Sequence, residues 1–219
     1  PEVLIHAHEY RDLSGDTPEQ DMAVLRLLLA VLHTVFSSVD QDGQTDWIDS
    51  PVKARKRWRA LWEKGYFKED VIRTYLEKYH ERFWLLHDQY PFWQIPEAAV
   101  GTEYTVAKLN GELSESGNKV RLFPLCNGIK KQEMEYAAAA RWLLYDTSAK
   151  PKGKGLPSPG VGWPGKLGLI AAVGDNLFQT LMLNLTLLKD GRSLWEGEDK
   201  PIWEREPSKK ERQEIAVPD

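Results

Sequence analysis

Residues 17–38 read TPEQDMAVLRLLLAVLHTVFSS, and this stretch decides the fold. Thr17 is followed directly by Pro18 and, two residues later, by Gln20, an order typical of a capped helix N-terminus. Apolar residues then recur at alternating spacings of three and four: Met22, Leu25, Leu29, Leu32 and Phe36. One apolar face results, so we expect a helix over 17–38 at the centre of the core, with Leu29 inside it.

Two more helices are predicted in the next forty or so residues. Ser50-Pro51 opens one of them, and Gly65 ends it, because glycine is the residue most often found just past a helix C-terminus. The other covers residues 68–79, where acidic residues in the first turn favour the positive end of the helix dipole.

Later segments predict two further helices and a few strands. Residues 132–146 are alanine-rich and strongly helical, and a last helix is expected over 176–188 with Asp175 as its cap. Strand signals are short and few: Tyr104–Leu109, Lys119–Phe123 and Leu167–Val173. The pattern as a whole predicts a helix-dominated α+β fold with a globular domain over 1–188. Residues 189–219 are polar and broken by proline, which indicates a linker or arm.

Composition is that of a soluble globular protein, with 42% hydrophobic and 28% charged residues. Net charge is −4, so any nucleic-acid site has to be local. The single cysteine, Cys126, excludes an internal disulfide and a cysteine-based zinc cluster, which fits the reducing cytoplasm. The longest apolar run, within residues 22–36, is interrupted by Arg26 and His33. It is too short to span a bilayer, and we expect a cytoplasmic protein with no membrane partner.

Two long loops interrupt the helical pattern. The first, ESGNKVRLFPLCNGIKK, covers residues 115–131; the second, TSAKPKGKGLPSPGVGWPGK, covers 147–166 and has four lysines and no acid. Across 119–166 nine lysines and arginines face three acids, a local charge of +6. Loops of this length in compact domains are usually functional or disordered, and phosphate binding requires such a cationic segment.

Catalytic and metal-binding patterns are weak. On a helix His6 and His8 point about 200° apart, so they cannot share an ion. His80, His87 and Asp88 could suggest acid–base chemistry, but no serine or cysteine nucleophile stands in a recognisable context. We therefore expect no enzyme activity, no metal and no cofactor.

Glycines of the second loop match a dinucleotide-binding pattern only by spacing. Gly160, Gly162 and Gly165 fit G-x-G-x-x-G, but a proline-rich loop precedes them where a strand is needed. Two interpretations of 147–166 remain on spacing alone. Its glycines let backbone approach another surface while its lysines neutralise phosphate, or it is simply a flexible basic loop.

Four blocks of sequence resemble consecutive blocks of the CasA family, the large subunit of the type I-E CRISPR Cascade complex. They are AHEYRDLSGDTPEQDMAVLRLLLAVLH (7–33), YPFWQ (90–94), EYAAAARWLLYDTSAKPKGKGLPSPGVGWPGKLG (135–168) and GDNLFQTLMLNLTLL (174–188). The likeness covers nearly the whole chain in the family's order. Family members begin with about two short strands and end in a four-helix bundle. Both are absent from this chain, so we expect it to be part of a longer protein.

This resemblance implies a non-catalytic subunit of a crRNA-guided antiviral complex. Such a subunit recognises a short flanking motif, the PAM, in duplex DNA, contacts the crRNA end and supports recruitment of the helicase-nuclease that cleaves. The implied partners are crRNA, double-stranded target DNA, the other Cascade subunits and that effector. Two alternatives stay open: a purely structural Cascade subunit, and a hydrolase that uses the His/Asp set at 80–88.

The resemblance also implies where the contacts lie. By motif position, a glycine loop approaches the PAM minor groove, and its residues here are Lys150, Lys152, Gly153, Lys154, Gly155, Leu156, Pro157, Ser158 and Lys166. A second loop contacts the crRNA end and neighbouring subunits, and its residues here are Asn118, Lys119, Arg121, Phe123, Asn127, Lys130 and Lys131. The family's PAM-side lysine and strand-separating wedge come from sequence beyond the matching blocks.

Overall fold

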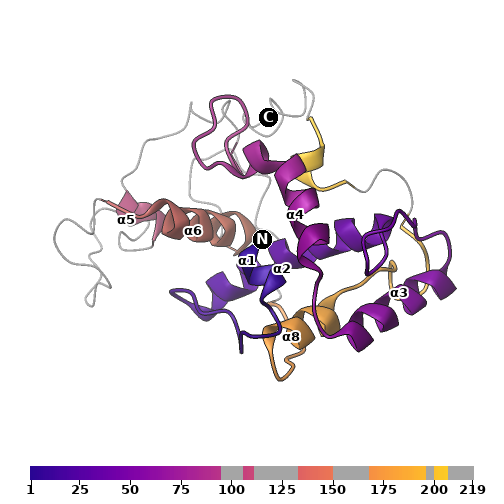
Figure 1. Cartoon of the computed structure of the whole chain (residues 1–219). Coiled ribbons are helices and arrows are strands. Elements are labelled where there is room, and N and C mark those ends of the chain that lie inside the picture. The colour runs from indigo at the N-terminus through magenta and orange to yellow at the C-terminus, as the bar shows by residue number, and fades with distance from the viewer. Residues whose placement is uncertain (95–105, 111–132, 150–167, 196–199, 207–219) are drawn as a thin grey trace. The chain divides into compact units, whose positions relative to one another are not determined.

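The computed structural model describes residues 1–94, 106–110, 133–149, 168–195 and 200–206 (Figure 1). Its contacts divide the chain into two compact units. The first consists of Pro1–His80 and Ile170–Glu206, and the second of Glu81–Leu169 and Pro207–Asp219.

The central helix of the first unit is α2, Pro18–Ser38, and its N-terminus confirms the predicted cap. Thr17 Oγ1 accepts a hydrogen bond from the Gln20 amide at 3.2 Å, and Pro18 occupies the first helical position. In a standard capping box the glutamine would bond the amide of the cap residue itself. Here Gln20 Oε1 instead accepts from the Asp16 amide at 3.0 Å, one residue earlier.

The buried face of α2 differs from the predicted one. Leu25, Leu32 and Phe36 are buried as expected, whereas Met22 and Leu29 are only half-buried. By length and composition alone α2 could cross a bilayer, contrary to the sequence expectation. Its contacts with α4 and α8 make it the core helix of this unit.

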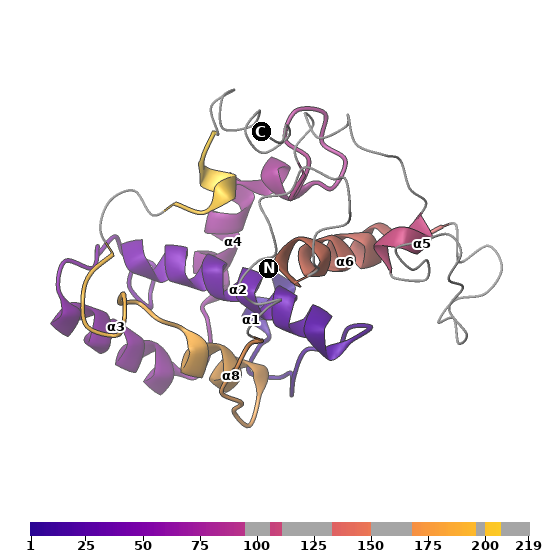
Figure 2. The same ribbon diagram turned by 180° about the vertical axis from the view of Figure 1, so that it is seen from behind.

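Four other helices surround α2: α1 (Glu2–Ile5), α3 (Pro51–Lys64), α4 (Glu69–Lys78) and α8 (Leu177–Asn184). Both predicted ends of α3 are confirmed, because Ser50 Oγ accepts from the Lys53 amide and Gly65 ends the helix at a φ of 77°. The α8 helix contacts α2 and α3, whereas α4 contacts α1 and α2. Figure 2 shows α3 and α8 side by side from behind.

Aromatic rings fill the centre of the first unit. Phe67 lies between Phe36 and Phe178, with ring centroids 5.8 Å and 4.9 Å away. Fully buried aliphatic side chains complete this core: Leu4, Leu32, Leu61, Ile72, Leu177, Leu181 and Met182. The core therefore joins the start of the chain to residues 177–182, which are far apart in sequence.

Part of the segment predicted to be a polar arm packs on α4. The short 3-10 helix η4, Ile202–Glu204, buries Trp203, which is 4% exposed. Trp203 Nε1 donates to the Tyr75 hydroxyl at 2.7 Å, and that hydroxyl donates to Glu204 Oε1 at 2.7 Å. Burial, together with the hydrogen bond to Glu204, raises the pKa of Tyr75 well above its ordinary value. A domain limit at residue 188 remains a prediction.

The second unit contains α5 (Val106–Leu109) and α6 (Tyr136–Ala149), which contact each other. Ala107 of α5 is buried, as are Trp142 and Leu144 of α6. The 3-10 helix η1, His80–Phe83, spans the boundary between the units and leads into a turn-rich segment. There Phe83 packs on Phe92 with ring centroids 5.7 Å apart, and the Arg82 guanidinium lies 3.8 Å from the Tyr90 ring centroid.

Two of the predicted strands are corrected. Within Tyr104–Leu109, residues 106–109 form helix α5, because their apolar side pairs with α6. Within the predicted strand Leu167–Val173, residues 168–173 belong to no helix or strand, and Leu167 lies outside the described ranges. In the described ranges β pairing is limited to the isolated bridges Val39–Thr45 and Lys189–Ser193. Lys119–Phe123 lies outside those ranges. The chain is helix-rich.

Candidate functional site

The residues predicted to bind nucleic acid all lie outside the described ranges. This holds for the glycine-loop residues Lys150–Ser158 and Lys166 and for the second-loop residues Asn118–Lys131. The structure describes instead the segments to which both loops are attached. These flanking segments are the part of the candidate site that the structure describes.

One helix, α6, separates the two predicted loops. The second loop ends shortly before Tyr136, and the glycine loop begins directly after Ala149. At about 1.5 Å of rise per residue, the 14 residues of α6 separate these two attachment points by about 21 Å. Trp142 and Leu144 are buried, and α6 contacts α5, so the helix is held by packing and not only by its own backbone bonds. The spacing of the two attachment points on α6 is thus fixed.

After the glycine loop, the chain is held in the first unit by Asn184, the last residue of α8. Its Oδ1 accepts from the Ala172 amide at 3.0 Å, and its Nδ2 donates to the Ala172 carbonyl at 2.7 Å. The same Nδ2 donates to the Thr180 carbonyl at 2.6 Å. One side chain therefore ties the segment that precedes α8, at Ala172, to the C-terminus of that helix.

Residues 174–176 form a tight turn at the N-terminus of α8. Asn176 is the N-cap and accepts from the Gln179 amide at 2.9 Å, which corrects the prediction of Asp175 as cap. The Asp175 amide donates to Gln179 Oε1 at 2.9 Å, and the Gly174 amide donates to Thr180 Oγ1 at 3.1 Å. A Cβ on Gly174 would overlap the Cβ of Gln179, so only glycine fits there. The helix itself ends at Asn184 rather than at 188.

The first turn of α8 docks on the segment that follows α1. The amides of Leu177 and Phe178 donate to the carbonyls of Tyr10 and Ala7, at 2.8 Å and 3.0 Å. Helix N-terminal amides lack partners within their helix, and here the chain itself supplies them. The docking joins two of the sequence blocks that carry the family resemblance, 7–33 and 174–188.

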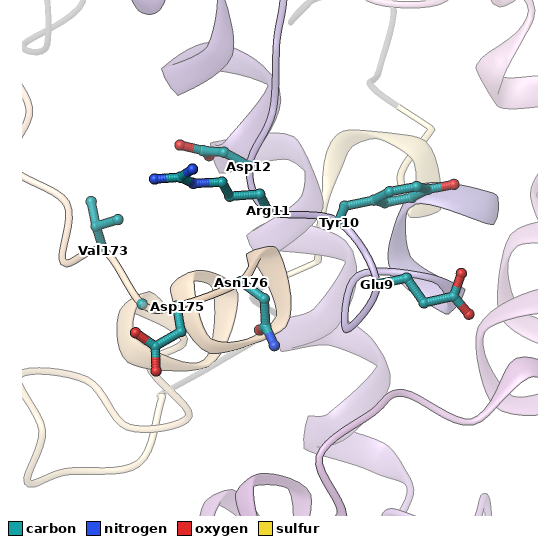
Figure 3. Close-up of a pocket in the computed structure, with 8 residues that line it drawn as sticks. Glu9, Tyr10, Arg11, Asp12, Val173, Asp175 and Asn176 are labelled. Carbon is teal, nitrogen blue, oxygen red and sulfur yellow. The ribbon is translucent and has the colours of Figure 1, made fainter.

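An open pocket of about 610 Å³ lies at this junction (Figure 3). Residues 9–12 line one side, and residues 173–176 line the other. Its charged side chains are Arg11 and the carboxylates of Glu9, Asp12 and Asp175. The pocket thus has a negative balance of charge, whereas the sequence of the glycine loop is basic.

The histidines considered for catalysis or metal binding have local structural partners. His87 Nδ1 accepts from the amides of Gln89 and Tyr90 at 3.2 Å and 3.0 Å, which closes a turn. His6 and His8 both lie near Glu9, at 3.2 Å and 3.5 Å. Within the described part of the chain, three or more His, Cys, Asp or Glu side chains nowhere gather in a group able to hold a metal.

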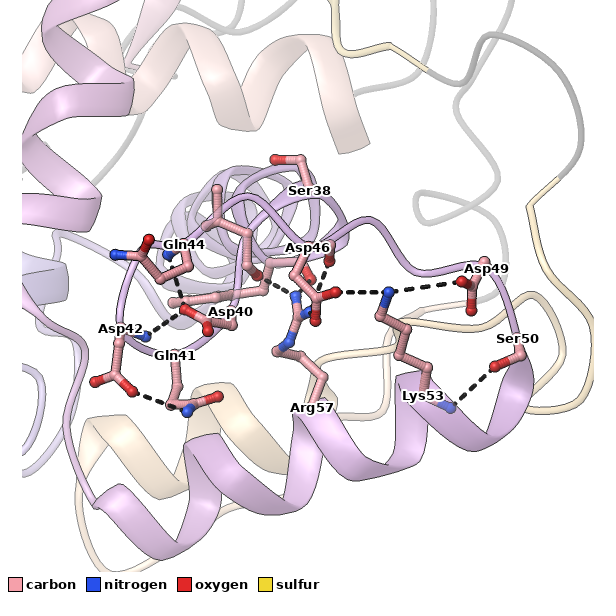
Figure 4. Close-up of polar contacts among 12 residues, drawn as sticks. Ser38, Asp40, Gln41, Asp42, Gln44, Asp46, Asp49, Ser50, Lys53 and Arg57 are labelled. Atoms are coloured by element: carbon pink, nitrogen blue, oxygen red, sulfur yellow. Dashed lines mark hydrogen bonds and ion pairs between the residues drawn. The ribbon is translucent and has the colours of Figure 1, made fainter.

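Helix α3 carries a charged surface that the sequence reasoning missed. It has six basic residues against one acid, Glu63: Lys53, Arg55, Lys56, Arg57, Arg59 and Lys64. Arg57 is 3% exposed and forms the centre of a polar network with the loop before α3 (Figure 4). Its guanidinium donates to the carbonyls of Phe36, Val39 and Asp46 and to Asp46 Oδ2 at 2.6 Å. Counting charges per helix, in addition to apolar spacing, would have found this surface.

The same loop engages two of the lysines. Lys53 Nζ lies 2.7 Å from Asp46 Oδ1, and Lys64 Nζ lies 2.6 Å from Asp42 Oδ1. The hydrogen bond from Lys53 lowers the pKa of Asp46, and the hydrogen bond from Lys64 lowers the pKa of Asp42. Asp40 organises the loop, because its Oδ1 accepts from the amides of Asp42 and Gln44, both at 2.9 Å. Three basic residues of α3 remain outside this network.

Comparison with known proteins identifies the family. The sequence model for CRISPR-associated protein Cse1 matches residues 1–219. A curated relative from Thermus thermophilus, CRISPR-associated protein CasA/Cse1, is 33% identical over 212 residues, which is 94% of this chain and 38% of that protein.

Solved structures of Cse1 (CasA) proteins are also similar to this chain. Thermobifida fusca Cse1 has a TM-score of 0.70 at 29% identity, and Thermus thermophilus CasA has 0.62 at 28%. The match covers 94% of this chain in both cases, with 39% and 37% of those chains. A chain of a structure described as a CRISPR RNA-guided surveillance complex shares the fold, with a TM-score of 0.68 at 22% identity over 94% of this chain and 42% of that one. The present chain thus spans less than half the length of these relatives, and it belongs to the Cse1 (CasA) family of CRISPR-associated proteins.

Proposed function

We propose that this chain is the part of a Cse1 subunit that reads the PAM in duplex DNA for an RNA-guided complex, without catalysing a reaction. The observation that carries the proposal is the family match over residues 1–219, which includes the glycine loop with its lysines. In this account the loop of residues 150–166 enters the minor groove beside the target, and base pairing to the guide reads the target itself.

The composition of the loop suits a minor-groove reader. The minor groove is only about 6 Å wide, so a protein segment has to bring its backbone close without bulky side chains. Gly153 and Gly155 meet that need, and the lysines at 150, 152, 154 and 166 can hold adjacent phosphates. Pro157 limits the conformational freedom that the loop loses on binding.

The described residues on either side of the glycine loop are consistent with this role. Helix α6 precedes the loop in the sequence, and after the loop Asn184, Thr180 and the docked N-terminus of α8 hold residues 172–178. The two flanking segments belong to different units of the structure.

The second loop, within residues 118–131, has the complementary role in this proposal. It contacts the crRNA end and the neighbouring subunits, while the assembled complex recruits the helicase-nuclease that cleaves. The assignment rests on the resemblance of the sequence to the family, and on the attachment of this loop to the opposite end of α6 from the glycine loop.

The test is binding of PAM-bearing and PAM-scrambled duplexes by a surveillance complex reconstituted with this protein. We expect the PAM-bearing duplex to bind more tightly and the advantage to depend on this subunit. Replacing Lys150, Lys152, Lys154 and Lys166 with alanine should lower the log–log salt slope by about one unit per lost phosphate contact. An unchanged slope would move the contact elsewhere.

Two rival functions have their own outcomes. Protection of residues 147–166 by the crRNA-loaded complex, with no further change on adding target duplex, would favour a purely structural subunit. Cleavage of DNA by the isolated protein with magnesium or manganese, lost in His87→Ala, would favour the hydrolase. We expect no cleavage, because His87 Nδ1 is engaged by two backbone amides.

A further inference from the structure

The exposed face of α3 carries three basic side chains that the fold does not use. Arg55, Lys56 and Arg59 are exposed, and the structure gives them no ion pair or hydrogen bond among the described residues. The other basic residues of the helix are engaged by the loop that precedes it, through Asp42 and Asp46. The three form a surface that we name the α3 cationic face.

The spacing of these residues places them together. Arg55 and Arg59 are four residues apart, and Lys56 and Arg59 three apart, so they are neighbours on one side of the helix. The opposite side is buried through Ala54 and Leu61. Like charges at these spacings repel each other and disfavour the isolated helix. The fold therefore concentrates charge at a place where the described part of the chain supplies no compensation.

Little nearby charge opposes the α3 cationic face. The one acid of α3, Glu63, lies four residues beyond Arg59 and makes no salt bridge with it in the structure. Helix α8, which packs on α3, has the sequence LFQTLMLN and no charged side chain. A positive potential is thus kept on one face of a chain whose net charge is −4.

A rigid aromatic pair borders this face. Trp62 follows Arg59 by three residues and stacks on Trp58, with ring centroids 5.3 Å apart and planes at 12°. Trp58 is fixed in turn, because its Nε1 donates to the Met182 carbonyl at 2.9 Å. An arginine next to an indole ring that is fixed in place is suited to nucleic acid, because the guanidinium can bind phosphate while the ring stacks against a base or sugar.

We infer that the α3 cationic face is a second nucleic-acid contact of this subunit, one that binds the phosphate backbone without reading sequence. Two of its three cations are arginines, whose planar fork matches phosphate oxygens in pairs. Arg55 and Arg59 lie about 6 Å apart along the helix axis, at about 1.5 Å per residue, which lets them engage separate phosphates. The inference rests on the proposed function in that it needs a complex that holds nucleic acid.

The experiment replaces all three residues together, as R55Q/K56Q/R59Q, in the full reconstituted complex. Glutamine retains helix propensity, and the sites are exposed, so the melting temperature should stay near that of the wild type. The matched control is K78Q/K189Q/R192Q, which removes three exposed cations elsewhere and gives the same net charge. The readout is the log–log salt slope for binding a duplex with neither PAM nor target.

We expect R55Q/K56Q/R59Q to lower that slope by about two to three units, at roughly 0.9 per phosphate, and the control to leave it unchanged. A parallel arm measures crRNA binding, because crRNA offers the same phosphate chemistry. A loss in the duplex arm assigns the face to DNA, and a loss confined to the crRNA arm assigns it to the guide. An unchanged salt slope together with unchanged crRNA binding would overturn the inference. A complex that lacks this subunit but keeps its normal crRNA content would also overturn it, because the face would then be a protein interface.

The same preparations separate this inference from the proposed function. PAM discrimination is measured with the wild-type complex, and its absence would reject the proposed function whatever α3 does. Normal discrimination together with an unchanged salt slope in R55Q/K56Q/R59Q would reject the α3 cationic face alone.

Discussion

Helices α2 and α8 begin in the same way, although they come from opposite ends of the chain. A Gly-Asp pair precedes a capping residue in both, and a glutamine follows the cap by three residues. In each, the cap accepts from the glutamine amide, the glutamine side chain accepts from the aspartate amide, and the next side chain accepts from the glycine amide. The donors and acceptors are Gly15, Asp16, Thr17, Gln20 and Asp21 at α2, and Gly174, Asp175, Asn176, Gln179 and Thr180 at α8.

The difference between them lies in what surrounds the glycine. A Cβ on Gly15 would meet the far ends of Gln20 and Asp21, at 2.5 Å and 2.8 Å, and those ends can move. A Cβ on Gly174 would overlap the Gln179 Cβ and lie 3.0 Å from backbone atoms of the first turn, which cannot. The α8 cap is also docked on the carbonyls of Tyr10 and Ala7. The same motif thus starts both helices, and at α8 its turn is more tightly packed and is docked on another segment of the chain.

The largest expected effects come from fully buried leucines within the two helices. Leu32→Ala in α2 and Leu181→Ala in α8 should each lower the free energy of unfolding by about 2–5 kcal/mol, since both side chains are 0% exposed. Leu183→Ala, at a side chain that is 45% exposed, serves as the control and should cost much less. Denaturant unfolding measures all three. If Leu29→Ala lowered the free energy of unfolding as much as Leu32→Ala, Leu29 would lie on the buried face of α2, as the sequence pattern predicts.

The next effect separates the two glycines. Gly174→Ala should lower the free energy of unfolding by about 1–3 kcal/mol, because a methyl group forced against backbone overpacks the turn. Gly15→Ala should cost less than half as much, since flexible side chains can withdraw. Thermal unfolding of both variants under one condition makes the measurement. Equal losses of stability in the two variants would show that the turns before α2 and α8 tolerate a methyl group equally well.

The caps themselves should behave alike. Thr17→Ala and Asn176→Ala each remove one side-chain acceptor for the amide of the third helical residue. Each should therefore cost about 1 kcal/mol, the usual loss for a helix N-cap. Chemical denaturation of the two single variants is sufficient. A loss at Asn176 well above that at Thr17 would indicate that docking on Tyr10 depends on the cap.

The smallest effect is expected at the start of α3. There an ion pair between Lys53 and Asp46 stands where α2 and α8 have a glutamine side chain that accepts from a backbone amide. The hydrogen bond from Lys53 lowers the pKa of Asp46 below its unfolded value, which is about 3.9. The ionised carboxylate therefore stabilises the fold at pH values above that, and this contribution is lost as the pH falls through the lowered folded pKa. Melting temperatures of wild type and Asp46→Asn should differ at pH 7 and converge towards pH 3. Asp190→Asn, at an exposed carboxylate without an ion pair among the described residues, should follow the wild type throughout.

Helix ends were the most predictable feature because their determinants are local. Thr17, Ser50 and Gly65 act where their residue types indicated. Asp175 was mistaken for the cap of α8 because aspartate and asparagine cap equally well, and only the hydrogen bond from Gln179 to Asn176 distinguishes them. The alternation in residues 104–109 suited a strand, but contact with α6 favours helix α5.

The candidate site was less predictable for a different reason. The family resemblance located two loops in the sequence, whereas the anchors depend on contacts between distant segments. Asn184 reaching Ala172, and Leu177 reaching Tyr10, have no signal in apolar spacing. The α3 cationic face has no signal in apolar spacing either, although its charges are visible in the sequence.

The central claim is that an anchored glycine loop reads the PAM, and Gly155→Trp tests it most directly. A large side chain should block entry into a groove only about 6 Å wide while leaving the core of the protein intact. Thr74→Trp, at an exposed position of α4, is the matched control. The measurement is paired: the melting temperature of each variant, then binding of PAM-bearing and PAM-scrambled duplexes by the reconstituted complex. We predict that Gly155→Trp keeps its melting temperature and assembles, yet loses most of the advantage of the PAM-bearing duplex, whereas Thr74→Trp keeps it. Normal discrimination by Gly155→Trp would contradict the account.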